Sequence, residues 1–123
     1  MGWEPYNLDQ AAHDLVFEQK DKNVFGEVYK MRTTVAYGLE RFWGERLRLS
    51  GEEAKYWEAT WEKLVDIMGK ADVKIPNHAD RDRQITELWL DSESKKDDRK
   101  VTLAVLTQLC DCMIWWTQRY KKA

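Results

Sequence analysis

Cysteine, proline and histidine are scarce in this 123-residue sequence, which contains two of each. Two cysteines are too few for a disulfide-stapled scaffold. Cys110 and Cys112 are two residues apart in a predicted helix, which turns their side chains about 200° apart, so they cannot bond each other or bind one ion together. We interpret them as buried thiols, with an intermolecular disulfide as the alternative. His13 and His78 have no nucleophile at a recognisable triad spacing and no ligand set for zinc.

The sequence also lacks a glycine-rich loop, a long apolar run and an excess of charge of one sign. Its six glycines are scattered and form no phosphate-binding pattern. The most apolar stretch lies within residues 101–120, and its apolar run, which contains Gln108 and Asp111, is too short to span a bilayer. A net charge of −2 provides no general attraction to nucleic acids or membranes. Residues 1–10 lack the basic start and apolar run of a secretory signal, so we expect a cytoplasmic protein without membrane association.

The residues that are present favour helices throughout. Apolar side chains recur every three or four positions, and no segment shows the alternation that is typical of strands. A chain of this length is expected to form a single domain, here residues 1–123. The predicted helices cover residues 8–20, 24–47 with a kink near Gly38, 51–69, 78–90 and 101–120. The residues expected to cap or end them are Asn7 with Gln10, Ser50 with Glu53, Asn77 with Asp80, and Asp97 or Asp98 at the starts, and Gly69 at the end of the third helix.

The predicted helix at residues 101–120 carries apolar residues on two faces. Val105 and Leu109 lie on one of these faces, and Leu106 and Cys110 lie on the other. A helix that is buried on two faces is typically the centre of a bundle. We therefore predict an all-α fold, a single compact bundle of about five helices around a central C-terminal helix.

Tryptophan is unusually frequent, with seven in 123 residues. This is more aromatic surface than a small core needs, so we expect part of it to contact a protein partner or another copy of the chain. Adjacent helical residues point about 100° apart, so Trp115 and Trp116 cannot face the same neighbour, and one of them is expected to be exposed. The alternative is that both pack inside the bundle. The predicted protein interface consists of Trp43, Trp115, Trp116 and Tyr120.

Lysine and arginine gather at three places in the sequence. Basic side chains bind phosphates without reading base sequence, and neighbouring aromatic rings can stack on bases, so these groups are candidates for contact with nucleic acid. The alternative is a solvated surface with cations near helix C-termini. The candidates are Arg41, Arg46 and Arg48 in the second helix and just after it, Lys95, Lys96, Arg99 and Lys100 before the last helix, and Arg119, Lys121 and Lys122 after its apolar part.

Three carboxylates, Glu58, Glu62 and Asp66, are spaced by four residues and share one face of the predicted third helix. Residues 62–67 resemble the second metal-binding motif of helical nucleoside-triphosphate pyrophosphohydrolases, which bind Mg²⁺ with carboxylates from two facing helices. The paired glutamate motif that this family carries on its preceding helix is absent here. We interpret the three carboxylates as a solvated stripe, with Mg²⁺-dependent nucleotide hydrolysis as the alternative.

Residues 97–123 resemble the terminal helix of the small α-helical subunits of type III CRISPR effector complexes. In that family a helix rich in Thr, Leu and Ala ends with Trp, a basic residue and an aromatic residue, and Trp116, Arg119 and Tyr120 occupy those places here. The resemblance implies a non-catalytic subunit that packs against its own copies and against backbone subunits, and that supports guide–target RNA through basic residues. The other similar positions are Thr102, Leu103, Ala104, Leu8-Asp9-Gln10, and Gly38-Leu39 ahead of Phe42.

No catalytic motif or cofactor-binding motif occurs in the sequence, so we expect a protein that is not an enzyme and needs no cofactor. The leading hypothesis is a helical binding or assembly module, specifically a subunit of a nucleoprotein complex. It would contact protein partners or its own copies, and RNA or DNA through phosphates. The alternative is a small helical protein that binds one protein partner and inhibits or adapts it, as phage-type inhibitors do.

Overall fold

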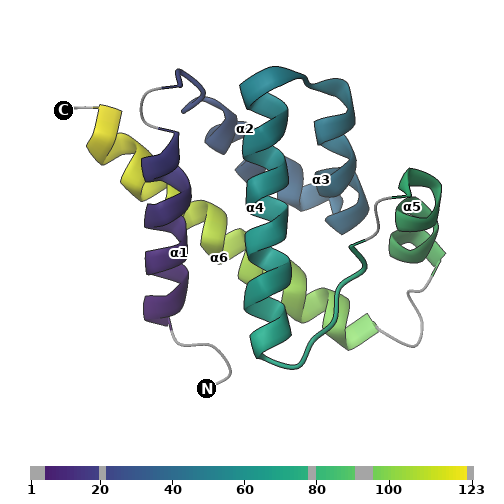
Figure 1. Ribbon diagram of the computed structural model, residues 1–123. Helices are drawn as coiled ribbons and strands as arrows, with labels where there is room; N and C mark the ends of the chain where they lie inside the picture. Colours follow the sequence, from purple (N-terminus) through teal and green to yellow (C-terminus); the bar gives the residue numbers. More distant parts are fainter. Residues whose placement is uncertain (1–4, 20–21, 78–79, 91–95, 122–123) are drawn as a thin grey trace.

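The computed structural model describes residues 5–19, 22–77, 80–90 and 96–121, and it confirms the all-α fold: these residues contain helices and no strand (Figure 1). None of the helices in these ranges is long and apolar enough to cross a membrane. The helices are α1 (Pro5–Glu18), α2 (Glu27–Thr34), α3 (Leu39–Glu45), α4 (Gly51–Lys70), α5 (Arg81–Leu90) and α6 (Lys96–Lys121), with short 3₁₀ helices η1 (Val35–Tyr37) and η2 (Arg46–Arg48).

The core lies where α1, α2 and α4 meet α6. Figure 1 shows α6 running diagonally behind α1 and α4, with its yellow end beside α1, and the helix also packs against α2. Helix α4 contributes the bulkiest buried side chains, among them Tyr56, Trp57 and Trp61. Helix α5 packs against α3, far from α1. The apolar interior is therefore shared between α4 and α6.

Helix α6 buries one face, not the two that its sequence suggested. Its buried apolar residues come from both predicted faces and form one broad stripe that consists of Val105, Leu106, Leu109, Cys110 and Met113. Val101 is exposed and Leu103 is only half-buried, so within the described part of the chain the N-terminal half of α6 is not fully covered on that side. Thr102 and Thr117 lie within the buried stripe, at either end of it.

Gly38 breaks the predicted helix at residues 24–47 into α2–η1 and α3–η2. Its backbone has φ +100° and ψ 172°, a conformation that is essentially restricted to glycine. The Gly38 N–H donates to the Val35 carbonyl and closes η1, and the Gly38 carbonyl accepts from the Phe42 N–H and opens α3. The chain therefore changes direction at this residue, and α3 returns along α4, where Phe42 and Trp43 enter the core.

Several predicted helix ends are wrong by a few residues. Helix α1 begins at Pro5, where the missing N–H of proline costs no helical hydrogen bond, so Asn7 lies inside the helix. Ser50 does precede α4, but its side chain makes no capping hydrogen bond. Helix α4 continues past Gly69 to Lys70, and Asp72, with φ +64°, takes the left-handed position that ends it.

The starts of α5 and α6 also differ from the prediction. The Asp80 carboxylate, not Asn77, caps α5 by accepting the Asp82 N–H at 3.0 Å and the Arg83 N–H at 3.4 Å. Helix α6 begins at Lys96, so the acidic pair at 97 and 98 lies in its first turn, where negative charge suits the helix dipole. Of the loop predicted at residues 91–98, residues 91–95 lie outside the described part of the chain.

Candidate functional site

Helices α1 and α6 together form a cluster of aromatic side chains, which we call the α1–α6 aromatic face and which consists of His13, Phe17, Trp115, Trp116 and Tyr120. The His13 ring stacks on Phe17 and meets the edge of Trp116, with ring centroids 5.6 and 4.7 Å apart. Tyr120 lies 5.8 Å from Phe17 and 6.4 Å from Trp116 between centroids. The His13–Trp116 and Phe17–Tyr120 contacts each join residues 103 positions apart in the chain, because α1 lies along the last turns of α6.

Two polar contacts fix the rings of this face. The His13 Nε2 atom lies 2.7 Å from the Tyr120 hydroxyl, a hydrogen bond whose donor depends on the imidazole tautomer. The Trp116 indole N–H donates to the Asp9 carboxylate at 3.1 Å. Tyr120 and Trp116 are half-buried, so both use their polar ends within the chain. They form the support of the face and not its most exposed part.

Trp115 and Phe17 are the exposed members of the face, with 48% and 46% of their surface accessible. The Trp115 ring meets the Trp116 ring edge-on, with centroids 4.8 Å apart at 89°, and the Arg119 guanidinium lies 4.0 Å above the Trp115 centroid. The prediction that one of the two tryptophans is exposed is therefore confirmed. Trp115 is held between a fixed ring and a cation while its outer side faces solvent.

Trp43 does not belong to this face, contrary to the prediction that it forms part of an interface. Only 2% of its surface is accessible, because α3 turns back onto the core after Gly38. The Arg46 guanidinium lies 4.8 Å from the Trp43 ring and covers it from the outside. Trp43 is a core residue in this structure.

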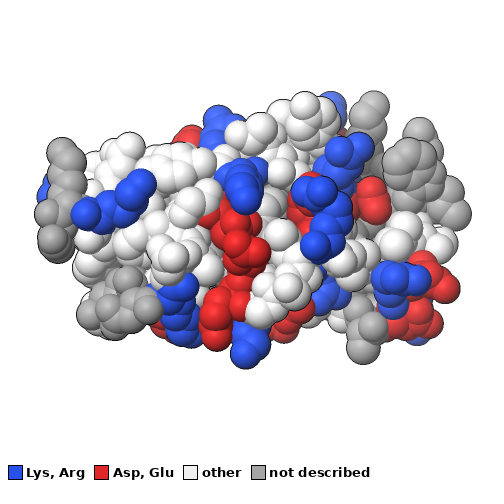
Figure 2. Space-filling view, turned by 90° about the horizontal axis from the view of Figure 1, so that it is seen from above, with Lys and Arg blue, Asp and Glu red and all other residues white. Residues whose placement is uncertain are grey.

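The three predicted basic groups lie at separate places. Arg41 and its neighbours are on α3 and η2, Lys100 is in the second turn of α6, and Arg119 is in its last turns. Lys100 and Arg119 are about 28 Å apart at 1.5 Å per residue. Figure 2 shows Lys and Arg interspersed with Asp and Glu on the face turned to the viewer. Lys95 and Lys122 lie outside the described residues, and the side chain of Lys96 is also undescribed.

Several of these basic side chains are already engaged within the protein. Arg46 donates to Glu58 at 2.8 Å, and Arg48 donates to Glu45 at 2.6 and 3.3 Å, contacts that raise the pKa of Arg48 above its usual range. Arg99 is half-buried, and two of its nitrogens are shielded from solvent. Among the described residues, the exposed basic side chains that lie on aromatic rings are Arg41 over Tyr37, Arg119 over Trp115 and Lys121 over Tyr29.

The acidic stripe on α4 is used in ion pairs instead of converging on one point. Glu58 accepts from Arg46, and Asp66 lies 3.5 Å from Lys70 one turn later. Glu62 is exposed between them. Within the described ranges, no group of three or more His, Cys, Asp or Glu side chains is arranged to hold a metal ion.

Both cysteines are free thiols on α6. Cys110 is buried, and this burial raises its pKa to about 12. Cys112 is half-buried, and desolvation followed by the nearby Asp9 and Asp111 charges raises its pKa as well. A thiol with a raised pKa is a poor nucleophile at neutral pH, so neither cysteine has the environment of a reactive residue.

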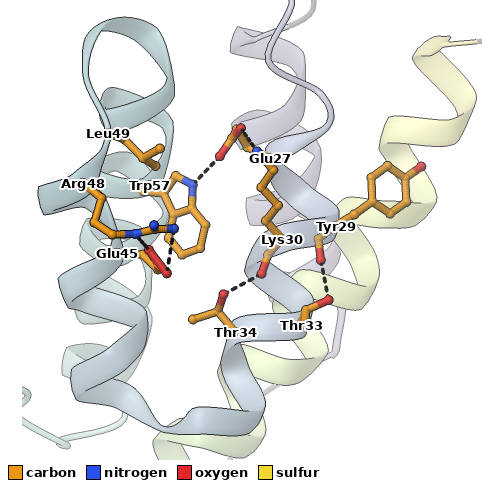
Figure 3. A pocket seen from close by; sticks show the side chains of 9 residues that line it. All are labelled: Glu27, Tyr29, Lys30, Thr33, Thr34, Glu45, Arg48, Leu49 and Trp57. Atoms are coloured by element: carbon orange, nitrogen blue, oxygen red, sulfur yellow. Dashed lines mark hydrogen bonds and ion pairs between the residues drawn. The ribbon is translucent and has the colours of Figure 1, made fainter.

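A cleft that the sequence did not reveal lies between α2 and η2, above Trp57 of α4 (Figure 3). We call it the α2–η2 cleft; its volume is about 380 Å³. The buried carboxylate of Glu27 accepts the Trp57 indole N–H at 2.8 Å and the Lys30 ammonium at 3.1 Å. Its lining residues are Glu27, Tyr29, Lys30, Thr33, Thr34, Glu45, Arg48, Leu49 and Trp57.

The only sequence signal for this cleft was a glutamate inside an apolar stretch. Glu27 lies between Phe25 and Val28 at a position that the helical pattern assigns to the core. Its partner Trp57 is 30 residues away on α4. No known protein family, curated protein or solved structure matches this chain.

Proposed function

We propose that this protein is a non-catalytic binding module that docks a protein partner on the α1–α6 aromatic face. The observation that carries the proposal is the exposed Trp115 ring, which is held by Trp116 and by Arg119 at 4.0 Å. Tryptophan and arginine are the residues most often found at the energetic centre of protein interfaces. A side chain that is already fixed loses little conformational freedom on binding, which favours affinity.

The layout of the face supports the same conclusion. Phe17 adds a second exposed ring beside Tyr120, so the apolar surface extends from α6 onto α1. Asp9 and Asp14 border the face on α1, and Arg119 and Lys121 border it on α6. An apolar centre with a charged border is the usual composition of a protein interface.

Affinity purification from the native host tests this proposal. We expect a protein that co-purifies with the tagged wild type to be lost when Trp115→Ala or Arg119→Ala removes the anchor. Tyr37→Ala is the matched control, because Tyr37 is also exposed and also lies under an arginine, but on η1. A partner that is retained by the Trp115→Ala variant would contradict the proposal. Sedimentation of the same variants identifies the case in which the partner is a second copy of the chain.

Contact with nucleic acid is the second candidate function, and it is supported by the basic residues next to the same face. Arg119 stacks on Trp115 and Lys121 lies 5.5 Å from the Tyr29 ring, a combination of cations and rings that suits phosphates and unstacked bases. In its specific form, this candidate is a small subunit of a nucleoprotein complex of the type III CRISPR kind. The paired Arg46 and Arg48 add less to it, since each already binds a carboxylate.

An electrophoretic mobility shift with single-stranded and duplex RNA tests this second candidate. We expect the double variant Arg119→Ala, Lys121→Ala to bind more weakly and with a shallower dependence on salt, since about one counterion is released per phosphate contact. Arg46→Ala with Arg48→Ala removes the same charge from residues that are ion-paired, and serves as the control. Equal weakening by both pairs, or no binding at low salt, would contradict it.

Two other functions give different experimental results. An inhibitor or adaptor of a single partner would return one dominant protein and no nucleic acid from the purification. Mg²⁺-dependent nucleotide hydrolysis would show as release of pyrophosphate from nucleoside triphosphates, with loss of activity in the Glu62→Gln variant. The pairing of Glu58 and Asp66 with basic side chains favours binding over hydrolysis.

A further inference from the structure

We infer that the α2–η2 cleft binds a small organic cation, an alkylguanidinium or alkylammonium ion, between the carboxylates of Glu27 and Glu45. The cleft has a volume of about 380 Å³, within the range of about 300 to 1,000 Å³ that is usual for small-ligand pockets. Figure 3 shows the carboxylates of Glu27 and Glu45 on either side of the Trp57 indole. A cation that lies between two carboxylates is stabilised by charge-assisted hydrogen bonds to both.

The two threonine hydroxyls that line the cleft are available only as hydrogen-bond acceptors. Thr33 donates its hydroxyl proton to the Tyr29 carbonyl at 3.0 Å, and Thr34 donates to the Lys30 carbonyl at 2.8 Å. Each hydroxyl oxygen therefore has lone pairs left and no proton to give. The Trp57 N–H is already used by Glu27. A ligand that reaches these groups must itself supply donors, which an ammonium or guanidinium ion does.

The acidic and basic side chains of the cleft differ in their exposure to solvent. The side chains of Glu27 and Glu45 are 5% and 18% exposed, whereas those of Lys30 and Arg48, which neutralise them, are 66% and 75% exposed. The negative groups therefore lie inside and the positive groups lie at the rim. Lys30 and Arg48 reach the carboxylates from the solvent side, so an entering cation can take their places while their ammonium and guanidinium groups return to water.

The Trp57 ring is held in place before any ligand arrives. Its indole N–H is fixed by Glu27, and the Phe42 ring packs against it with centroids 4.9 Å apart. Leu49 borders the cleft beside it. Because the ring and Glu27 need no rearrangement, the ordering cost of binding falls mainly on the two rim cations.

Isothermal titration of the full chain at low ionic strength, with agmatine and methylguanidine as probes and inorganic phosphate as the anion control, tests this inference. We expect agmatine to bind at a single site and phosphate to give no saturable signal. Glu45→Gln should weaken agmatine binding by about tenfold, the loss expected for one charge-assisted hydrogen bond. Glu62→Gln removes the same charge from an exposed residue of α4 outside the cleft and should leave the affinity unchanged.

Removing the basic side chains at the rim should have opposite effects on affinity in a cation site and in an anion site. Lys30→Ala and Arg48→Ala remove the internal competitors for Glu27 and Glu45, so each should strengthen agmatine binding. Weaker binding in these variants, saturable binding of phosphate, or equal effects of Glu45→Gln and Glu62→Gln would overturn the inference. Failure of agmatine to bind the folded wild type, with its helical circular dichroism intact, would overturn it as well.

Discussion

His13 and Tyr120, 107 residues apart in the sequence, are joined by a 2.7 Å hydrogen bond between the His13 Nε2 atom and the Tyr120 hydroxyl. The bond connects α1 to the last turns of α6 at the point where the aromatic face is built. Tyr120→Phe removes the hydroxyl and keeps the ring, so we expect a loss of about 0.5 to 1.5 kcal/mol in the free energy of unfolding. Urea denaturation measures this loss, and an unchanged midpoint would show that the bond contributes nothing.

Gly38→Ala should destabilise the fold because of the backbone conformation and not because of crowding. A Cβ at this position meets no atom within 4 Å, but φ of +100° with ψ of 172° is strained for any residue with a Cβ. We expect a loss of about 1 to 3 kcal/mol. Gly69→Ala is the matched control: the site is also open but helical, so this variant should be about 0.5 to 1 kcal/mol more stable. Thermal unfolding of both variants measures these opposite changes in stability.

Tyr56→Phe should be tolerated at neutral pH and should protect the protein at alkaline pH. The Tyr56 hydroxyl is buried without a hydrogen-bond partner among the described residues, and burial raises its pKa above the usual range. The unfolded chain ionises this tyrosine near pH 10 while the folded chain does not, so its contribution to stability declines as pH rises above about 10. At pH about 10.5 the wild type should lose roughly 0.8 kcal/mol more than the variant, relative to pH 7.

The two thiols should react with Ellman's reagent at different rates. Cys112 is half-buried and Cys110 is fully buried with a pKa of about 12, so the native protein should react slowly, and at Cys112 first. The Cys112→Ala variant should show no reaction until urea unfolds it, whereas Cys110→Ala should keep the slow native phase. Rapid reaction of both thiols in the native protein would contradict the burial of α6 described above.

The helices themselves were predictable because they depend on local pattern. Apolar residues at helical spacing identified α1, α4 and α6 to within a few residues, except that α6 starts five residues earlier than expected. The exposure of one residue of the pair at 115 and 116 also followed from the angle between neighbours on a helix. Helix bounds and the directions of neighbouring side chains depend on local spacing along the chain, which can be read directly from the sequence.

Features that join distant segments were not predictable in this way. Gly38 predicted a kink, but the direction of α3 after this residue could not be predicted, and that direction places Trp43 in the core instead of at the surface. Glu27 contacts Trp57 because α2 and α4 pack side by side, and the cleft above them lies between α2 and η2. Periodicity tells which face of a helix is buried, but the residue that it meets there depends on how the helices pack, and that packing forms both the aromatic face and the cleft.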